Sequence, residues 1–432
     1  MKTKQVQITL GLAFLVIVAV LSCSKSKHGS GEVTPVDTTK VSEKTVIDTL
    51  PPSTPMKHVG ALHTPADFAR IKLKLANHAE PWTSGYNKLI NNVSAQTTYV
   101  ANPTEKLIRG GRTVWEPEPD NYSRAMNDVA AAYQLALRWK ITGDSTYAQT
   151  AINILNAWAR TCKVIAGDTN AALAAGLYGY QFAIAGELLR DYSGWKTEDF
   201  VAYQKWMIDV FYSANMSFLK EHFGTCYTHY WANWDLANLS SVLAIGILTD
   251  ERSIYNYAVD YLQRGKGNGN WFHAINYVFD GENEGLAQLQ ESGRDQGHAT
   301  LVISLLGVIA QLTWNQGDDF YGLDDNRFLK ACEYTAKYNV AHLEVPFHEY
   351  IRYYGHNCDS ETYTAISDAS RGISRPMWTA PYFHYTRIEN MKAPYTLMGV
   401  NQTSPEGGGR DYGTTSGAFD QLGFGTLMYT VD

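Results

Sequence analysis

The stretch that decides the fold is residues 291–298, which read Glu-Ser-Gly-Arg-Asp-Gln-Gly-His and lead into the apolar run 301–312. The spacing of apolar residues in that run predicts a buried helix. If the helix includes the polar stretch, Glu291, Arg294 and His298 stand at i, i+3 and i+7 and project from one face. A carboxylate, a guanidinium and an imidazole are costly to bury unless they pair or take part in chemistry. This stretch is therefore the first candidate for a functional site.

Gly293 and Gly297 lie within the same predicted turns. Each glycine costs a helix about 1 kcal/mol relative to alanine. We therefore expect another part of the chain, or a ligand, to pass close to this stretch.

Helical periodicity continues along most of the chain after His63, with few strand signals. Thr64 followed by Pro65 indicates a helix start, and residues 142–144 (Thr-Gly-Asp) indicate a stop. The expected helices cover residues 124–141, 145–161, 170–191, 198–220, 233–249, 251–264, 285–314 and 326–341. Helical hairpins without a fixed-length repeat favour an all-α fold, an α/α toroid or incomplete barrel around a central cleft. The glycine-rich segment 405–427 is expected to be irregular and to cover part of the fold or line one end of the cleft.

Residues 1–23 have the pattern of an export signal, with a basic start followed by an apolar run over residues 8–21. The run is too short and too close to the start for a spanning helix. Val-Leu-Ser before Cys23 is typical of a lipobox, in which the cysteine is lipidated; a plain secretory signal is the alternative. Residues 24–57 predict a flexible tether, and residues 58–432 a single domain. The pattern predicts an exported lipoprotein in the periplasm or outer membrane of a Gram-negative bacterium.

The composition limits the classes of partner. With 36 Lys and Arg against 43 Asp and Glu, the chain carries a net charge of −7, which makes nucleic acid an improbable ligand. A local cluster of Arg and His can still bind a polyanion inside a cleft. The 28 Tyr and 11 Trp suit carbohydrate binding, because ring faces stack on sugars, although large helical cores also use aromatics.

The cysteines after Cys23 do not form a Cys-x-x-Cys pair, which argues against a zinc site. Export permits a disulfide, but the sequence does not identify the pairing, and buried free thiols are the alternative. The residues concerned are Cys162, Cys226, Cys332 and Cys358.

Three further clusters combine polar and aromatic side chains. Residues 228–235 begin a predicted helix, where Asn233 can face a substrate or act as an N-cap. Residues 348–356 can place a phenol near the cleft or form a surface loop with aromatic anchors. Residues 371–387 can form a substrate platform or a structural loop. The candidate side chains in these clusters are Tyr230, Asn233, Trp234, Arg352, Tyr353, Tyr354, Arg375, Trp378 and His384.

Residues 288–298 resemble the core motif of bacterial alginate-lyase-like polysaccharide lyases, most closely polysaccharide lyase family 38. Residues 135–158 are similar to a helical hairpin common across that clan, and the tail segments 405–408 and 421–427 also resemble the family. The resemblance extends over nearly everything after residue 58. The motif at 291–298 is its specific part, whereas the hairpin supports only a helical toroid.

The resemblance implies an enzyme that cleaves alginate or a related polyuronate by β-elimination between C4 and C5, leaving unsaturated oligosaccharides. The substrate carboxylate must be neutralised, a base must take the C5 proton, and an acid must protonate the departing oxygen at C4. The scheme requires neither a metal nor another cofactor. The expected partners are an anionic polysaccharide and, through the lipid anchor, a membrane.

Carried over to this chain, the resemblance implies that Asn233 binds the substrate carboxylate beside His298. Arg294 would hold the carboxylate or keep a tyrosine close to its phenolate form, and Glu291 would orient His298 or Arg294. Tyr353 is the expected acid, and also the base when proton and leaving group lie on the same side. His298 is the expected base when they lie on opposite sides. A tyrosine has a usual pKa of about 10, so a nearby cation must lower it before it acts as a base.

The resemblance further implies substrate-binding side chains around these groups. The expected ones are Tyr230, Trp234, Arg352, Tyr354, Arg375, Trp378 and His384. Tyr227-Thr228-His229 stands where some relatives in the clan have Asn-Asn-His, so His229 receives no catalytic role.

Two other functions fit part of the sequence. A glycoside hydrolase on a similar scaffold needs two carboxylates about 5 to 10 Å apart. Those available are Asp128, Glu282, Glu284, Glu291 and Asp295. A non-catalytic, lipid-anchored glycan-binding protein suits the aromatic content but has no need of a Glu-Arg-His group.

Overall fold

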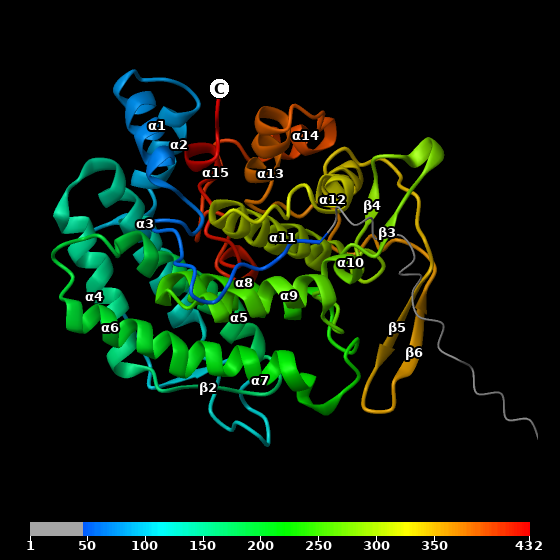
Figure 1. Ribbon diagram of the computed structural model, residues 1–432, viewed down its shortest axis with the longest axis horizontal. Coiled ribbons are helices and arrows are strands. Elements are labelled where there is room, and N and C mark those ends of the chain that lie inside the picture. Colours follow the sequence, from blue (N-terminus) through cyan, green and yellow to red (C-terminus); the bar gives the residue numbers. More distant parts are fainter. Residues whose placement is uncertain (1–45) are drawn as a thin grey trace, which may run out of the picture. The chain divides into compact units, whose positions relative to one another are not determined.

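The computed structural model describes residues 46–432, so the predicted export signal, Cys23 and residues 24–45 of the predicted tether lie outside the described residues. The described chain is mainly helical, and its long helices pack side by side (Figure 1). Helix α5 packs against α3 and α8, and α8 packs against α9 and α11. The helices of four residues or more are α1 (Pro65–Ala76), α2 (Trp82–Ile90), α3 (Ser123–Thr142), α4 (Ser145–Thr161), α5 (Ala171–Leu189), α6 (Thr197–Trp206), α7 (Ser213–Glu221), α8 (Ala232–Thr249), α9 (Arg252–Arg264), α10 (Trp271–Ala274), α11 (Gln296–Gln316), α12 (Leu323–Asn339), α13 (Thr379–Phe383), α14 (Pro394–Thr403) and α15 (Gly425–Met428), with π-helical turns at Met207–Tyr212 and His384–Ile388.

Local sequence signals explain several helix ends. Thr64 caps α1 by accepting a hydrogen bond from the backbone N–H of Asp67, whose own side chain accepts from Thr64 N. Helix α3 ends at Gly143, which has φ +77°, a left-handed conformation that favours glycine. Asp144 then caps α4. The predicted helix start at residues 64–65 and the turn at residues 142–144 are therefore confirmed.

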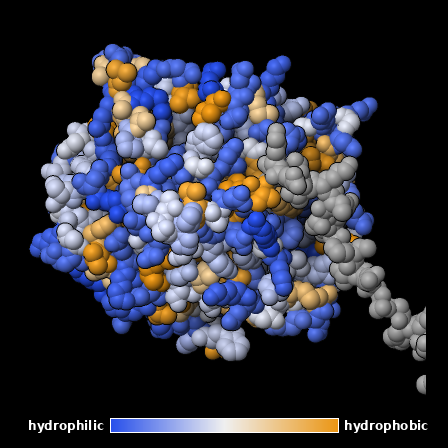
Figure 2. Space-filling view, in the orientation of Figure 1, coloured by the Kyte–Doolittle hydropathy of each residue, from blue (hydrophilic) through white to orange (hydrophobic). Residues whose placement is uncertain are grey.

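The core is built around α5, α8 and α11: residues of α5 and α8 are almost all buried, and most of those of α11 are. Helices α5 and α8 run parallel and close together, with Gly176 facing Ala237 and Gly179 facing Ser241. A Cβ added to Gly176 would lie 2.7 Å from the carbonyl carbon of Ala237, so glycine allows this close packing. Helix α11 is long and apolar enough to cross a membrane, but it is mostly buried against its neighbours. The apolar run at 301–312 is therefore a core helix, as predicted. The face shown in Figure 2 is largely hydrophilic, with hydrophobic residues in small separate patches.

Two predicted boundaries are wrong. The helix expected over 285–314 begins only at Gln296, because residues 290–294 form a turn and Asp295 is the N-cap. Part of the expected tether is ordered: Met56 is buried and its backbone N–H donates to Asp250. Arg252 donates to the carbonyl oxygens of residues 54 and 55. The folded domain therefore begins before residue 58.

In residues 46–432, three two-stranded sheets accompany the helices. Strands β1 (Lys106–Ile108) and β2 (Val164–Ala166) are parallel, and β3 (Tyr277–Val278) pairs antiparallel with β4 (Ala287–Gln288). The third is a hairpin of β5 (Tyr350–Tyr354) and β6 (Asp359–Tyr363), in which Arg352 pairs with Glu361. Residues 348–356, expected as part of the cleft or as a loop, therefore include an antiparallel strand.

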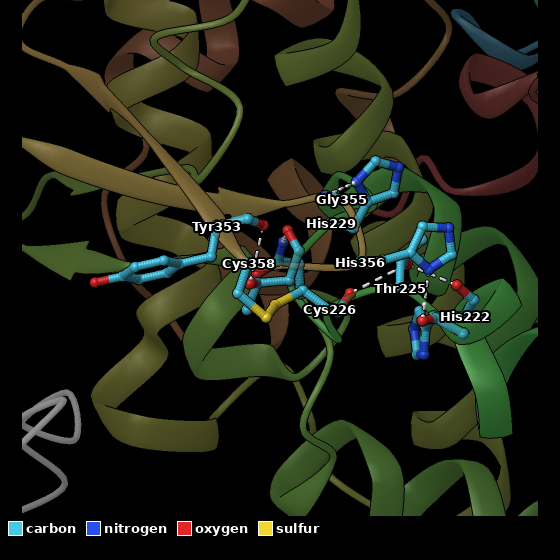
Figure 3. The surroundings of a disulfide bond; sticks show 11 residues. His222, Thr225, Cys226, His229, Tyr353, Gly355, His356 and Cys358 are labelled. Atoms are coloured by element: carbon cyan, nitrogen blue, oxygen red, sulfur yellow. Dashed lines mark hydrogen bonds between the residues drawn. A yellow bond between two sulfur atoms is a disulfide. The ribbon is translucent and has the colours of Figure 1, made fainter. Parts of the chain in front are cut away.

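A disulfide between Cys226 and Cys358 ties the turn of this hairpin to the segment before α8 (Figure 3). Their Cα atoms are 5.5 Å apart although the residues are 132 positions apart in sequence. Cys162 and Cys332 are buried free thiols. The protein therefore contains both a disulfide and buried free thiols, the two alternatives that the sequence left open.

The glycine-rich segment 405–427 lies largely inside the fold. Tyr180 of α5 donates to the carbonyl oxygen of Asp420, and Gln181 donates to that of Phe419 at 2.8 Å. Gly423 has φ +74°, and a Cβ there would lie 2.1 Å from the carbonyl oxygen of Gly407. Glycine is therefore required at this position, where the segment folds back on itself. The hydrogen bonds from α5 confirm the prediction that the segment covers part of the fold.

Candidate active site

The first turns of α5, α8 and the segment before α11 meet at one end of the core. The side chain of Asn238, in the second turn of α8, donates to the carbonyl oxygen of Ala172 at the start of α5. The backbone N–H of Asn233 donates to Glu291 at 2.8 Å. These hydrogen bonds hold the starts of α5 and α8 and the turn before α11 together.

Glu291 joins α8 to the turn before α11. Its side chain is 0 % exposed. Its Oε1 accepts from the backbone N–H and the side-chain amide of Asn233, at 2.8 and 2.7 Å, and its Oε2 accepts from Arg294 Nη1 at 2.9 Å. A buried carboxylate needs such donors because it has lost its hydration. The N-cap of α8 is Trp231, so Asn233 is not the cap; it is buried and holds Glu291.

Arg294 remains partly accessible, with 26 % of its side chain exposed. Its guanidinium carbon lies 5.0 Å from the ring centroid of Trp231, and that of Arg352 lies 4.6 Å from the same centroid. Arg352 also donates to the carbonyl oxygen of His229 at 2.6 Å. Two cations near one indole make a positive region that suits an anionic ligand.

His298 and Asp295 form a second polar pair. Asp295 Oδ1 accepts from the backbone N–H of His298 at 2.8 Å, and Asp295 Oδ2 lies 2.6 Å from His298 Nδ1. Burial of the Asp295 carboxylate would raise its pKa, but the hydrogen bonds from His298 and the charge of Arg294 bring that pKa below its usual value. The ionised carboxylate accepts a hydrogen bond from Nδ1–H, so neutral His298 has a free lone pair on Nε2. The imidazole is 38 % exposed.

The predicted single helix face is therefore wrong, although the three groups are close. Glu291 and Arg294 precede α11, and only His298 lies on the helix. Glu291 contacts Arg294 as expected, but the carboxylate that contacts the His298 ring is that of Asp295. The expected close approach is found at Gly293, where an added Cβ would lie 2.9 Å from Cβ of Tyr363.

Strand alternation separates the tyrosines of β5. Tyr350, Arg352 and Tyr354 are partly buried, whereas Ile351 and Tyr353 point outward. Tyr353 is 36 % exposed, and its ring points away from His229 and the disulfide (Figure 3). Tyr350 and Tyr354 therefore share the strand face of Arg352; Tyr350 accepts a hydrogen bond from Gln290, whereas the Tyr354 ring centroid lies 5.4 Å from the Arg352 guanidinium.

Tyr363 of β6 is a further phenol near this region. Its ring lies 5.5 Å from that of Trp231. Burial and a hydrogen bond with Glu361 raise the pKa of Tyr363 to about 12, against the opposing charge of Arg352. Tyr363 is therefore a protonated phenol at neutral pH. Sequence reasoning missed it, because only the strand pairing brings it to Trp231.

His229, which the sequence interpretation left without a role, is held by the hairpin. The backbone N–H of Gly355 donates to His229 Nδ1 at 2.8 Å. Burial and the charges of Arg352, His356 and His222 lower the pKa of His229. The neutral ring therefore carries its proton on Nε2, the opposite tautomer to that of His298.

Arg375 does not belong to an open substrate platform. Its side chain is 8 % exposed and forms an ion pair with Asp420 at 3.1 Å. It also donates to the carbonyl oxygens of Gly297 and Gly417 and to Thr300 Oγ1. Arg375 therefore connects α11 to the C-terminal segment, and the prediction that it binds substrate is wrong.

Trp378 and His384 are also buried. The ring of His384 stacks on Tyr321 with centroids 3.6 Å apart, and burial lowers the pKa of His384 to about 4. Tyr230 is buried beside Trp234, whose own side chain is partly exposed, with ring centroids 4.8 Å apart. Substrate contact was expected for all four residues, but only Trp234 reaches the surface.

Within residues 46–432, no group of three or more His, Cys, Asp or Glu side chains is placed to hold a metal ion. The arrangement instead offers a fixed imidazole lone pair on His298, an N–H donor on His229, and the guanidinium groups of Arg294 and Arg352. These groups can bind a carboxylate and move a proton.

A family model described as alginate lyase matches residues 90–345. An alginate lyase from Bacteroides ovatus is 12 % identical, with a TM-score of 0.54 covering 87 % of this chain and 100 % of its own. A variant of alginate lyase A1-III of Sphingomonas species A1, complexed with a tetrasaccharide, is 13 % identical, with a TM-score of 0.59 covering 88 % of this chain and 98 % of its own. The shared fold confirms the predicted α/α toroid. No curated protein matches the sequence.

Proposed function

Because the chain belongs to the alginate lyase family, we propose that it is a polysaccharide lyase that cleaves alginate or a related polyuronate by β-elimination. The observation that carries this proposal is the partly exposed His298 imidazole, held with Nε2 free, beside the Arg294 guanidinium, since both groups contact Asp295. β-Elimination at a uronic acid requires a base for the C5 proton and a cation for the carboxylate at the same sugar.

The proposed reaction follows from the charges involved. The substrate carboxylate opposes loss of the C5 proton, so Arg294 and Arg352 neutralise it, and the Nε2–H of His229 donates a further hydrogen bond. His298 Nε2 takes the C5 proton. The C5–H electron pair becomes the C4=C5 double bond, and the C4–O bond breaks with its electrons on oxygen. Tyr354 protonates that oxygen.

Two roles differ from those that the family resemblance implied. Tyr354 replaces Tyr353 as the acid because the Tyr354 ring lies beside the Arg352 guanidinium, whereas Tyr353 is on the opposite strand face. Asn233 is buried, so it supports Arg294 through Glu291 and does not touch the sugar. Each assignment can be tested with a single substitution.

The carboxylates near the site argue against a glycoside hydrolase. Such an enzyme needs one carboxylic acid and one free carboxylate across the sugar. Glu291 is buried with three donors, and both oxygens of Asp295 are bonded to His298. Asp128 is buried and accepts hydrogen bonds from the side chains of Tyr99 and Trp158. These carboxylates already have partners within the protein.

The decisive experiment is a digest of alginate, polymannuronate, polyguluronate and glucuronan. We expect ultraviolet absorbance from the conjugated double bond to rise together with new reducing ends on at least one polymer. New reducing ends without absorbance would establish a hydrolase. Binding of a polymer without either signal would establish a glycan-binding protein. The polymer that is cleaved fastest identifies the uronic acid that the enzyme prefers.

We also propose that the protein is exported and anchored through lipid on Cys23, a residue outside the described part of the chain. A Cys23→Ser variant should appear in the soluble periplasmic or secreted fraction, while the unaltered protein sediments with membranes. Equal sedimentation of the two would contradict lipid anchoring.

A further inference from the structure

Asp295 binds one residue with both of its carboxylate oxygens. Oδ1 accepts from the backbone N–H of His298, which is the usual N-cap contact at the start of α11. Oδ2 is not needed for capping and lies 2.6 Å from Nδ1 of the same residue. The side chain that starts the helix therefore also holds the imidazole ring.

The support for this pair is rigid. Helix α11 has 21 residues, most of them buried, so the capped first turn is attached to the core of the molecule. Arg375 donates to the carbonyl oxygen of Gly297, within the same turn. A ring whose backbone and Nδ1 are both fixed has little freedom about its side-chain bonds.

The other charged groups around the pair are few. Arg294 Nε lies 3.6 Å from Asp295 Oδ2 and favours the ionised carboxylate. The C-terminal segment contributes Asp420, whose negative charge is paired with Arg375. The carboxylate of Asp295 is the acceptor in direct contact with the imidazole.

We propose that Asp295 is a positioning residue that holds His298 in the tautomer with the proton on Nδ1, so that Nε2 presents its lone pair to the C5 hydrogen. This inference rests on the proposed function, in which His298 is the base. When Nε2 takes the proton, the new imidazolium faces a carboxylate 2.6 Å away, which stabilises the charge formed in the reaction.

The test is Asp295→Asn. The asparagine oxygen can still cap α11, but its amide donates to Nδ1 and moves the ring proton to Nε2. We expect kcat to fall about 100- to 1000-fold, with KM and the thermal midpoint nearly unchanged. The matched control is Asp144→Asn, which alters the exposed aspartate cap of α4, whose Oδ1 accepts from Thr146 N, and should leave kcat unchanged.

Nitrogen NMR of the histidine-labelled protein gives a readout that a purely structural role would not change. In the unaltered protein the His298 signal, assigned by its loss in His298→Ala, should show Nδ1 protonated and Nε2 bare. Asp295→Asn should reverse this. A kcat within twofold of the unaltered protein, or an unchanged tautomer, would overturn the inference. If no polyuronate is cleaved, the proposed function fails, while the NMR result still decides whether Asp295 sets the tautomer.

Discussion

Arg294 and Arg375 are two arginines for which the sequence suggested the same task, contact with an acidic sugar. Arg375 is 8 % exposed and donates to Asp420, Thr300 and two carbonyl oxygens, so its hydrogen-bonding capacity is used inside the protein. Arg294 is 26 % exposed, and its close carboxylate contact is with Glu291. The comparison shows that a guanidinium becomes available to a ligand only where the fold leaves donors unused at the surface.

The histidines show the same contrast. The ring of His298 is 38 % exposed and is bonded at Nδ1, which leaves Nε2 for a substrate. The ring of His384 is 3 % exposed and is stacked on Tyr321. One histidine is placed for proton transfer, and the other contributes to packing.

The largest effect is expected at His298. His298→Ala should lower kcat about 100- to 10,000-fold, because the C5 proton loses its acceptor. The free energy of unfolding should change little, since the ring is partly exposed. Initial rates of ultraviolet absorbance and a urea titration measure the two quantities. Turnover within twofold of the unaltered protein would remove His298 from the mechanism.

Arg375→Ala should lower the free energy of unfolding by about 3–5 kcal/mol, because Asp420 would remain buried without its cation. Arg294→Ala should be less destabilising, since Glu291 keeps both donors from Asn233, and should instead raise KM and lower kcat. Denaturant titrations and steady-state kinetics on both variants test the contrast. Equal losses of stability would contradict the division between the two arginines.

His384 should affect stability through pH. Its folded pKa of about 4 lies below its usual value of 6.5, because the ring is buried, so below pH 6.5 the unfolded chain takes up a proton that the folded chain does not. Stability should therefore fall as pH falls from 6.5 to 4, by roughly 1.4 kcal/mol per unit at most. His384→Leu should lack this dependence. The difference in the free energy of unfolding between the unaltered protein and His384→Leu, measured from pH 6.5 to pH 4, gives the contribution of His384. A difference that does not change with pH would contradict burial of the neutral ring.

The smallest effect is expected at Tyr353. Its ring points outward from β5, so Tyr353→Phe should keep kcat and KM within twofold of the unaltered protein. Tyr354→Phe, one residue along the strand, should lose most turnover while substrate binding persists. Steady-state kinetics on the two variants, with a binding titration, compare the two faces of the hairpin. A loss confined to Tyr353→Phe would return the acid role to that residue.

Much of the fold could be predicted because helix signals are local. Thr64 and its partner Asp67 are three residues apart, and the turn at residues 142–144 depends on one left-handed glycine and one cap. The same local reasoning failed over residues 285–295. There, Gln290 and Glu291 bond to the first turn of α8, so long-range contacts replace a helical turn.

The sequence by itself determined the helical class, the apolar run at the centre of the core, and the stretch that contains Arg294 and His298. The tertiary structure alone decided that Arg375 is buried and that Tyr353 points outward. It also decided that the N–H of Gly355 sets the tautomer of His229, 126 residues away. Hydrogen bonds within a turn or helix depend on neighbours a few positions apart, which a sequence displays. Burial and proton placement depend on groups that only folding brings into contact.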